Sequence, residues 1–505
     1  MNSMSFPILS SMIGICLFGA VLIALLSKAQ VALARMFALV FTSASLGLGA
    51  YLVWAFKATD KMQAAESYTW IKDLGIKFSL GVDGLSVFLV ALCVFLFPLA
   101  ILISGKVKHN ERSFFAWLLF LEAAVLTVFC ARDLFVFFVG FELVLIPMYF
   151  LILGFGHGNA KKVAIKFFLF TMAGSVFFLA SMLAIASMRH GAVGTWSFDL
   201  EDLRKYSVAN ISGSTATWLF AGFAIAFAVK VPLFPLHTWL PDAHTEAPTA
   251  GSIILAGVLL KLGTYGFIRI AISFFPEAAH QLRWLFLTVS VIGIIYGAIV
   301  ATMQPDLKRL IAYSSIAHLG FVVLGIFSFN SQGISGATFT MVSHGLTTGA
   351  LFALVGIMYD QTHTREIAKY SGLMKTVPIL SGAFLIATFA SIGLPGFSGF
   401  VGEFLSMLGA FQTARVYVGF AATGVIFAAL YLLWAYQRAF TGEPNDTAKS
   451  MKDLTFKELI VVVPLLAMSL FLGLAPQYML DRINPSVDKT TTQISKTINV
   501  DPGVK

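Results

Sequence analysis

Long apolar runs fill most of the chain and predict an all-α membrane protein with about fourteen transmembrane helices. A helix needs about 20 apolar residues to cross the hydrocarbon core of a bilayer, and most of the runs have that length. The runs cover residues 7–26, 33–56, 84–104, 113–131, 134–154, 163–188, 215–243, 248–273, 282–302, 307–329, 334–358, 378–411, 415–440 and 457–475.

Two of these runs carry helix-breaking residues near their middles. Pro232, Pro235 and Pro241 interrupt residues 215–243, and the segment Gly393-Leu-Pro-Gly396 interrupts residues 378–411. Proline removes a backbone donor and clashes with the preceding turn. Hydrocarbon cannot satisfy the freed backbone groups, so we expect both breaks to face protein or a cavity.

Short motifs recur five helices apart, in the same order along the chain. Asp133-Leu134 returns as Asp306-Leu307, Phe170-Thr-Met172 returns as Phe339-Thr-Met341, and Val231-Pro-Leu-Phe234 is echoed by Leu394-Pro-Gly-Phe397. Because five is odd, the paired helices run in opposite senses, which is typical of inverted-repeat transporters.

The repeats suggest four parts. Residues 1–112 hold three helices with an outer loop at 57–83, and residues 113–273 form the first five-helix repeat. Residues 282–440 form the second repeat, and residues 441–505 hold one more helix and a polar tail.

Charge is sparse and confined mainly to the loops. The chain is 58% hydrophobic and 12% charged, with a formal net charge of +9. The basic residues lie in short loops rather than along one face, so the charge indicates membrane orientation and not nucleic-acid binding. Counting them predicts that both termini lie outside. The loops predicted to face inward include Lys28, Lys106, Lys108, Lys161, Lys308, Arg365 and Lys452.

Five ionisable residues lie inside apolar stretches, namely Glu122, Glu142, Lys230, Lys261 and Glu403. Each costs about 2.5–3.5 kcal/mol at mid-membrane depth. They must therefore face one another or water inside the bundle. One interpretation is a set of structural ion pairs, and the other is a proton relay. The backbone breaks beside Lys230 and Glu403 favour the relay, in which Glu142 would move relative to Lys230 and switch its hold on a proton.

Histidines add possible intermediates. His318 and His344 lie near the middles of two successive apolar runs. Their side chains either pack through hydrogen bonds or pass protons, since imidazole changes charge near neutral pH. His237 and His244 flank the first break, but no further ligand completes a zinc set. We expect them to hydrogen-bond to water or backbone.

Other acidic residues have simpler interpretations. Asp133 and Asp306 begin helices and can act as N-caps. Asp83, Glu66, Asp73 and the acidic cluster at 199–202 are expected to be solvated loop charges, and residues 68–80 a surface hairpin.

No redox motif is visible. The sequence has no Gly-rich dinucleotide fingerprint, Walker loop or cluster-binding cysteine pattern, and its three cysteines lie in apolar runs. We therefore expect no cofactor in this chain, with energy supplied by a partner or an ion gradient.

Several of these stretches resemble the antiporter-like membrane subunits of respiratory complex I. They are Lys230–His244, Glu246–Thr249, Ala256–Gly266, Leu80–Ser86 and Gly140–Leu151. The last two resemble the M type, which is called subunit 4 in mitochondria. Glu403 in the second broken helix also fits that type, because the sister subunits carry lysine there.

The resemblance implies a fourteen-helix fold with inverted repeats in which Glu142 pairs with Lys230 and Lys261 lies mid-channel. His318 and His344 would link the halves and Glu403 would serve the outward exit, with Glu122 as an additional carboxylate.

It also implies partners. NADH, FMN, iron–sulfur clusters and quinone would bind to other subunits, and sister L and N subunits would adjoin this chain, most simply in a bacterial inner membrane. The alternatives are a subunit of a multi-subunit sodium/proton antiporter or of a membrane-bound hydrogenase; a purely structural scaffold is the remaining option.

Overall fold

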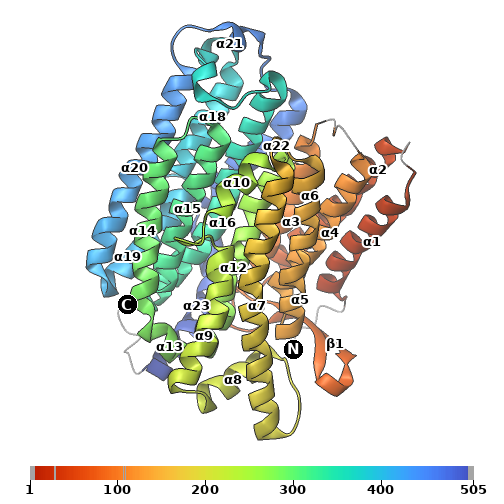
Figure 1. The fold of residues 1–505 in the computed structure, drawn as a ribbon, viewed down its shortest axis with the longest axis vertical. Coiled ribbons are helices and arrows are strands. Elements are labelled where there is room, and N and C mark those ends of the chain that lie inside the picture. The colour runs from red at the N-terminus through yellow and green to blue at the C-terminus, as the bar shows by residue number, and fades with distance from the viewer. Residues whose placement is uncertain (1–5, 28–29, 106, 108–109, 499–505) are drawn as a thin grey trace.

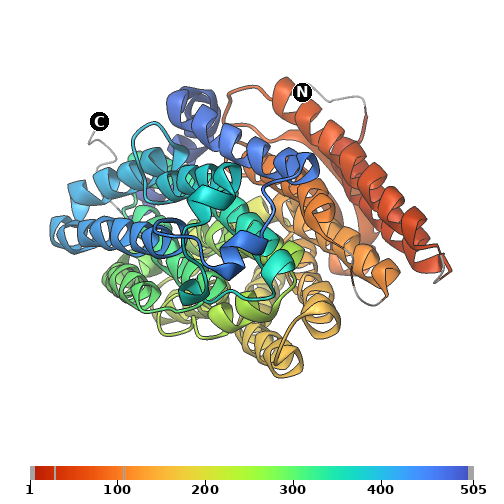
Figure 2. The same ribbon diagram turned by 90° about the horizontal axis from the view of Figure 1, so that it is seen from above.

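Helices dominate the computed structural model, which describes residues 6–27, 30–105, 107 and 110–498 (Figure 1). Lys28, Lys106 and Lys108, which were counted for orientation, lie outside the described residues. Most helices run along the long axis of the molecule. Seen from above, α1 and α2 form a layer at one edge of the bundle (Figure 2).

Twelve helices in the described part are long and apolar enough to cross a membrane. Two further predicted runs hold shorter helices: α3 (Val87–Ile103), and the pair α18 (Pro378–Ser391) and α19 (Ser398–Thr413). The prediction of membrane-spanning helices is confirmed, while the count of fourteen stays a prediction. The twelve are α1 (Ile8–Leu25), α2 (Val31–Ala55), α4 (Glu111–Cys130), α5–α6 (Leu134–Phe155), α7 (Ala160–Val193), α9 (Gly213–Lys230), Thr249–Ile272, α14 (Arg283–Thr302), α15 (Leu307–Ile326), α16 (Ser331–Thr362), α20 (Arg415–Phe440) and α22 (Phe456–Leu474).

The segment Thr249–Ile272, here called the Lys261 helix, is irregular. It consists of α11 (Thr249–Ile254), a π-helical turn (Leu255–Leu259), α12 (Leu260–Gly266) and a second π-helical turn (Phe267–Ile272). Turns of π-helix are rare overall, and those that occur are often found at functional sites.

One end of the bundle carries the β-hairpin and several short helices, and is here called the hairpin end (Figure 1). Strands β1 (Gln63–Ile71) and β2 (Ile76–Val82) pair antiparallel, which agrees with the predicted hairpin. Helices α8 (Leu200–Asn210) and α13 (Pro276–Gln281) lie at the same end. The opposite end carries α17 (Leu373–Thr376) and α21 (Asp446–Ser450).

Within the predicted polar tail, the described residues form a helix, α23 (Gln477–Ile498). Its buried face includes Met479, Ile483 and Val487, and it packs against α16 and α13. Apolar residues spaced three to four apart give one face that can cover the bundle while the other stays polar.

The internal repeat is visible in matching local structure. Asp133 caps α5 by accepting from Phe135 N and Val136 N, and Asp306 caps α15 in the same way from Lys308 N and Arg309 N. Each aspartate also forms an isolated antiparallel bridge, with Asp199 and Glu366 respectively.

The two breaks match as well. After α9, Leu233 N donates to Ala228 O, and after α18, Leu394 N donates to Phe389 O. Both helices therefore end with a hydrogen bond from an N–H to the carbonyl five residues earlier. Helix α10 (Trp239–Glu246) follows the first break and α19 follows the second.

Candidate functional site

The Lys261 helix places a buried cation in the centre of the bundle. Lys261 is fully buried and follows the first π-helical turn. Its ammonium donates to the carbonyl of Ala256 in that turn and lies 2.8 Å from Nδ1 of His344 on α16. A desolvated charge is tolerated only with such polar partners, so the turn and the histidine together make the position possible.

From His344 the contacts continue within the second repeat. The rings of His344 and His318 have centroids 5.9 Å apart, and His318 Nδ1 lies 2.5 Å from Oε1 of Glu403. The hydroxyls of Ser391 and Tyr431 lie 3.5 Å from the other His318 nitrogen. Lys261, His344, His318 and Glu403 therefore form one buried series across four helical segments.

Close packing of α16 against α19 sets the position of Glu403. A Cβ on Gly402 would lie 2.7 Å from Thr340 N, and one on Gly336 would collide with Ser406 N. Glycines at these positions let the two helices approach closely, as small residues do at membrane helix interfaces. The neighbouring Glu403 is thereby held against His318.

Lys230 does not belong to this series of contacts. It is the last residue of α9, at the point where the first helix breaks. The partial negative charge of a helix C-terminus favours a cation there. Its ammonium has no hydrogen-bond partner among the described residues and lies 4.7 Å from the centroid of the Phe141 ring.

The predicted pairing of Glu142 with Lys230 is absent from this conformation. The two side chains form no ion pair in the described part of the chain, and one carboxylate oxygen of Glu142 lacks a partner. Glu142 instead lies next to the Ser175 hydroxyl. Lys230 acts on the Glu142 carboxylate only through its charge, from farther away than in an ion pair. Phe141 lies under the ammonium in place of the carboxylate.

Glu122 belongs to a separate cluster. It is fully buried on α4 and faces Ser45 of α2 and Cys16 of α1, and neither of its oxygens has a hydrogen-bond partner among the described residues. Helix α4 packs extensively on α1. The structure therefore does not bring Glu122 into the series that starts at Lys261.

The histidines beside the first break stack on aromatic rings. His237 stacks on Phe234, and His244 stacks on Phe352 with centroids 4.6 Å apart. Neither nitrogen of the His244 ring has a hydrogen-bond partner in the described residues. The expected bonding of this ring to backbone is thus not found. In the described part of the chain, no group of three or more His, Cys, Asp or Glu side chains could hold a metal ion.

Lys308 and Asp83 are buried charges that sequence reasoning placed in loops. Lys308 is 5% exposed and donates to the carbonyl of Ala247. Asp83 is 6% exposed and forms an ion pair with Arg269, so its interpretation as a solvated charge was wrong. Both lie next to helix ends, where sequence alone does not reveal which loops are covered by other parts of the chain.

Comparison with known proteins identifies the family of this chain. Residues 131–438 match the family model described as "NADH:quinone oxidoreductase/Mrp antiporter, TM". NADH-quinone oxidoreductase subunit M of Rhodobacter capsulatus is 45% identical over 436 residues, which is 85% of each chain. NADH-ubiquinone oxidoreductase chain 4 of Marchantia polymorpha is 41% identical over 95% of this chain and 96% of its own. This chain belongs to the subunit M family of antiporter-like membrane subunits.

Solved structures agree with that family. A chain of respiratory complex I from Thermus thermophilus with bound NADH matches with a TM-score of 0.88 and 32% identity, covering 97% of this chain and all of that one. A chain of the Mrp complex from Dietzia sp. DQ12-45-1b matches with a TM-score of 0.84 at 19% identity, over 98% of this chain and all of that one, which shows a shared fold. The subunit M fold and the prediction of an integral membrane protein are thus confirmed.

Proposed function

We propose that this chain is the proton-translocating subunit M of an NADH:quinone oxidoreductase. The observation that carries the proposal is the buried contact series from Lys261 through His344 and His318 to Glu403. Ionisable groups are costly at this depth, and membrane transporters use them as proton relays. The names of the relatives in Rhodobacter and Marchantia support the same assignment.

The chemistry within the series is proton exchange between neighbours. A proton leaves the Lys261 ammonium for Nδ1 of a neutral His344, and that imidazole can release a proton from its other nitrogen toward His318. Imidazole suits this step because it gains and loses a proton near neutral pH. His318 then exchanges with the Glu403 carboxylate, which it contacts directly.

Glu142 and Lys230 form the switch of the first repeat. Lys230 lies at the helix break, and Glu142 follows Phe141, the ring beneath the ammonium. When the carboxylate approaches, the lysine holds its proton; when the carboxylate withdraws, as here, the lysine can release it toward the Lys261 helix. Glu122 is an auxiliary carboxylate outside this path.

The chain holds no redox cofactor in this proposal. NADH, FMN, iron–sulfur clusters and quinone belong to partner subunits, and L-type and N-type sisters adjoin this chain in a bacterial inner membrane. Both termini and the hairpin end face outward. Support for this orientation comes from the opposite end, where Lys166, Arg309, Arg365 and Lys375 gather in ion pairs, because basic loops tend to remain inside.

The test uses membrane vesicles that contain the whole complex with a single substitution in this chain. We expect Lys261→Ala and Lys230→Ala to abolish NADH-driven proton pumping, measured by fluorescence quenching of a pH-gradient dye. The matched control is Lys375→Ala, since Lys375 is exposed and pairs only with exposed Glu443. Near-normal pumping in Lys261→Ala, with the complex assembled at wild-type amounts, would refute the proposal.

A further inference from the structure

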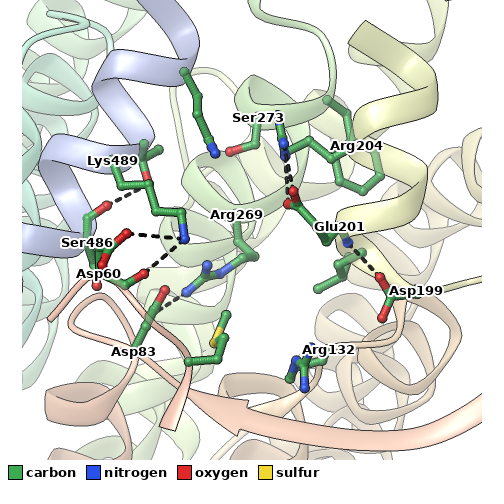
Figure 3. A pocket seen from close by; sticks show the side chains of 15 residues that line it. Asp60, Asp83, Arg132, Asp199, Glu201, Arg204, Arg269, Ser273, Ser486 and Lys489 are labelled. Carbon is green, nitrogen blue, oxygen red and sulfur yellow. Dashed lines mark hydrogen bonds and ion pairs between the residues drawn. The ribbon is translucent and has the colours of Figure 1, made fainter. Parts of the chain in front are cut away.

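A charged cavity opens at the hairpin end, away from the relay. Its volume is about 240 Å³, and we call it the vestibule. Helices α8 and α23, the α4–α5 loop, the segments around β1 and β2, and the end of the Lys261 helix surround it. Its charged lining consists of Asp60, Asp83, Arg132, Asp199, Glu201, Arg204, Arg269 and Lys489 (Figure 3).

Most of these charges belong to the wall of the vestibule and interact locally. Arg204 binds both oxygens of Glu201 on α8, and this hydrogen-bonded guanidinium lowers the pKa of the Glu201 carboxyl. Lys489 of α23 donates to the Asp60 carbonyl at 3.0 Å, and its ammonium lies 3.7 Å from the Asp60 carboxylate. Ion pairs that remain partly exposed, as these do, contribute little to stability.

Arg269 differs because it belongs to a membrane-spanning segment. It lies in the second π-helical turn of the Lys261 helix, eight residues after Lys261. Its Nη2 donates to Asp83 Oδ1 at 2.6 Å, and the two side chains are only 14% and 8% exposed. Figure 3 shows the Arg269 guanidinium directed toward the Asp83 carboxylate. A buried ion pair is by itself weak evidence for stability.

Tyr265 lies between Arg269 and Lys261, at four-residue spacing on one face of the helix. Arg269 Nε donates to its hydroxyl at 3.0 Å, and that hydroxyl reaches the Phe129 carbonyl at 3.4 Å. The Tyr265 ring packs on Phe129 and Phe137, with centroids 5.6 and 6.3 Å away.

An aromatic cluster continues from Tyr265 toward Lys230. Phe137 packs against Phe141, Phe178 and Phe227, and Phe141 lies beneath the Lys230 ammonium. Close-packed rings exclude water, and apolar constrictions block ion passage by dewetting. Packed rings therefore extend from Tyr265, which contacts Arg269, to Phe141 beneath the Lys230 ammonium.

The loop of Asp83 is held in place by α23. Gly84 N donates to Ser486 Oγ at 2.9 Å, and a Cβ on Gly84 would lie 2.8 Å from Ile483 Cα. The Asp83 carboxylate also accepts from Leu85 N. The partner of Arg269 is thus fixed by the C-terminal helix.

We propose that Arg269, Asp83 and Tyr265 form a seal that keeps protons in the outward vestibule from returning to Lys261. Arginine is suited to this task because its guanidinium does not release its proton under physiological conditions, so it cannot act as a relay. A fixed cation at a constriction also repels protons, as in other proton-excluding pores. Asp83 holds the guanidinium, and Tyr265 joins it to the aromatic cluster. The seal rests on the proposed function, since it protects the relay through Lys261.

The test measures passive proton entry into proteoliposomes that contain the assembled complex. No NADH is added, an acid pH step is applied outside, valinomycin with potassium clamps the potential, and an enclosed dye reports pH. We expect Arg269→Gln to admit protons several-fold faster than the wild type, and Asp83→Asn to do so to a smaller extent. Arg269→Lys keeps the cation and should leak less than Arg269→Gln.

Two comparisons make the result specific. Arg204→Gln is the matched control, because Arg204 lines the same vestibule but, among the described residues, forms its ion pair within α8. The double variant Arg269→Gln with Lys261→Ala should return the leak toward the wild-type rate. An unchanged rate in Arg269→Gln overturns the seal, and so does a double variant that leaks as fast as Arg269→Gln.

The seal and the proposed function fail in different ways. If Lys261→Ala alone pumps normally with NADH, the relay is wrong, whatever Arg269→Gln does. If Arg269→Gln slows NADH-driven turnover and pumping together without any passive leak, Arg269 acts in forward transport and the seal is wrong while the relay stands.

Discussion

The Lys261 ammonium lies 2.8 Å from Nδ1 of His344. This contact joins the last helix of the first repeat to α16 in the second. The two residues are 83 positions apart in the sequence. Lys261 also donates to a carbonyl in a π-helical turn, so the irregular backbone and the histidine share its solvation. Proton exchange between the two repeats can take place at this contact.

Glu403→Gln should remove proton pumping while preserving the fold. The amide has nearly the same shape as the carboxyl but cannot take up a proton, so the series ends at His318. We expect pumping in vesicles to fall roughly tenfold or more, since general acid–base groups typically contribute 10²–10⁴-fold. Glu443→Gln is the control, because Glu443 is 87% exposed and pairs with Lys375. Wild-type pumping in Glu403→Gln would remove Glu403 from the path.

Glu122→Gln should reduce pumping less than Glu142→Gln does. Glu122 faces Ser45 and Cys16 in the N-terminal layer, while Glu142 lies near Lys230. An amide at position 122 keeps the packing of α4 on α1 and α2. Both variants are compared by pumping per NADH oxidised. If Glu122→Gln proves the more damaging substitution, Glu122 belongs to the relay after all.

The sequence predicted the apolar runs, both breaks and the repeat, and, among the buried charges, Glu122, Lys230, Lys261 and Glu403. These features are local: apolar length, a proline or glycine cluster, or a charge surrounded by apolar residues defines each of them. Asp133 and Asp306 were predicted as caps for the same reason, and the structure confirms both.

Features that depend on distant segments were missed. Whether Asp83 is solvated depends on Arg269, 186 positions away, and on α23. Lys308 was predicted to be a loop cation, because nothing nearby in the sequence shows that its ammonium donates to the Ala247 carbonyl. The α23 helix was missed because a proline and many polar residues hide its apolar face. The separation of Glu142 from Lys230 depends on side-chain conformation, which sequence patterns do not specify.

Gly402→Ala should destabilise the subunit and impair pumping, although it adds only one methyl group and leaves every ionisable side chain in place. The added Cβ would lie 2.7 Å from Thr340 N, so α19 must move away from α16 and take Glu403 with it. Overpacking of this kind costs about 1–3 kcal/mol. The expected result is a lower thermal unfolding temperature together with weaker pumping.

Gly419→Ala provides the matched comparison for that substitution. Gly419 lies in α20 with no atom within 4 Å of an added Cβ. Replacing a helical glycine with alanine in open space stabilises by about 0.5–1 kcal/mol. We therefore expect the two glycine variants to shift the unfolding temperature in opposite directions. A fall of equal size in both would show that the α16–α19 contact is not what limits stability.

Ser486→Ala should loosen α23 more than Lys489→Ala does. The Ser486 hydroxyl accepts from the buried Gly84 N, and its loss leaves that donor unpaired, at a cost of about 1–3 kcal/mol. Lys489 and Asp60 form an exposed ion pair 3.7 Å apart, and the ammonium also donates to the exposed Asp60 carbonyl. Such exposed pairs contribute about 0–1 kcal/mol. Limited proteolysis, followed by detection of the released C-terminal fragment, measures how often α23 leaves the bundle. The Ser486 variant should release it sooner; faster release from the Lys489 variant would mean that surface charge, rather than the buried hydrogen bond, holds the helix in place.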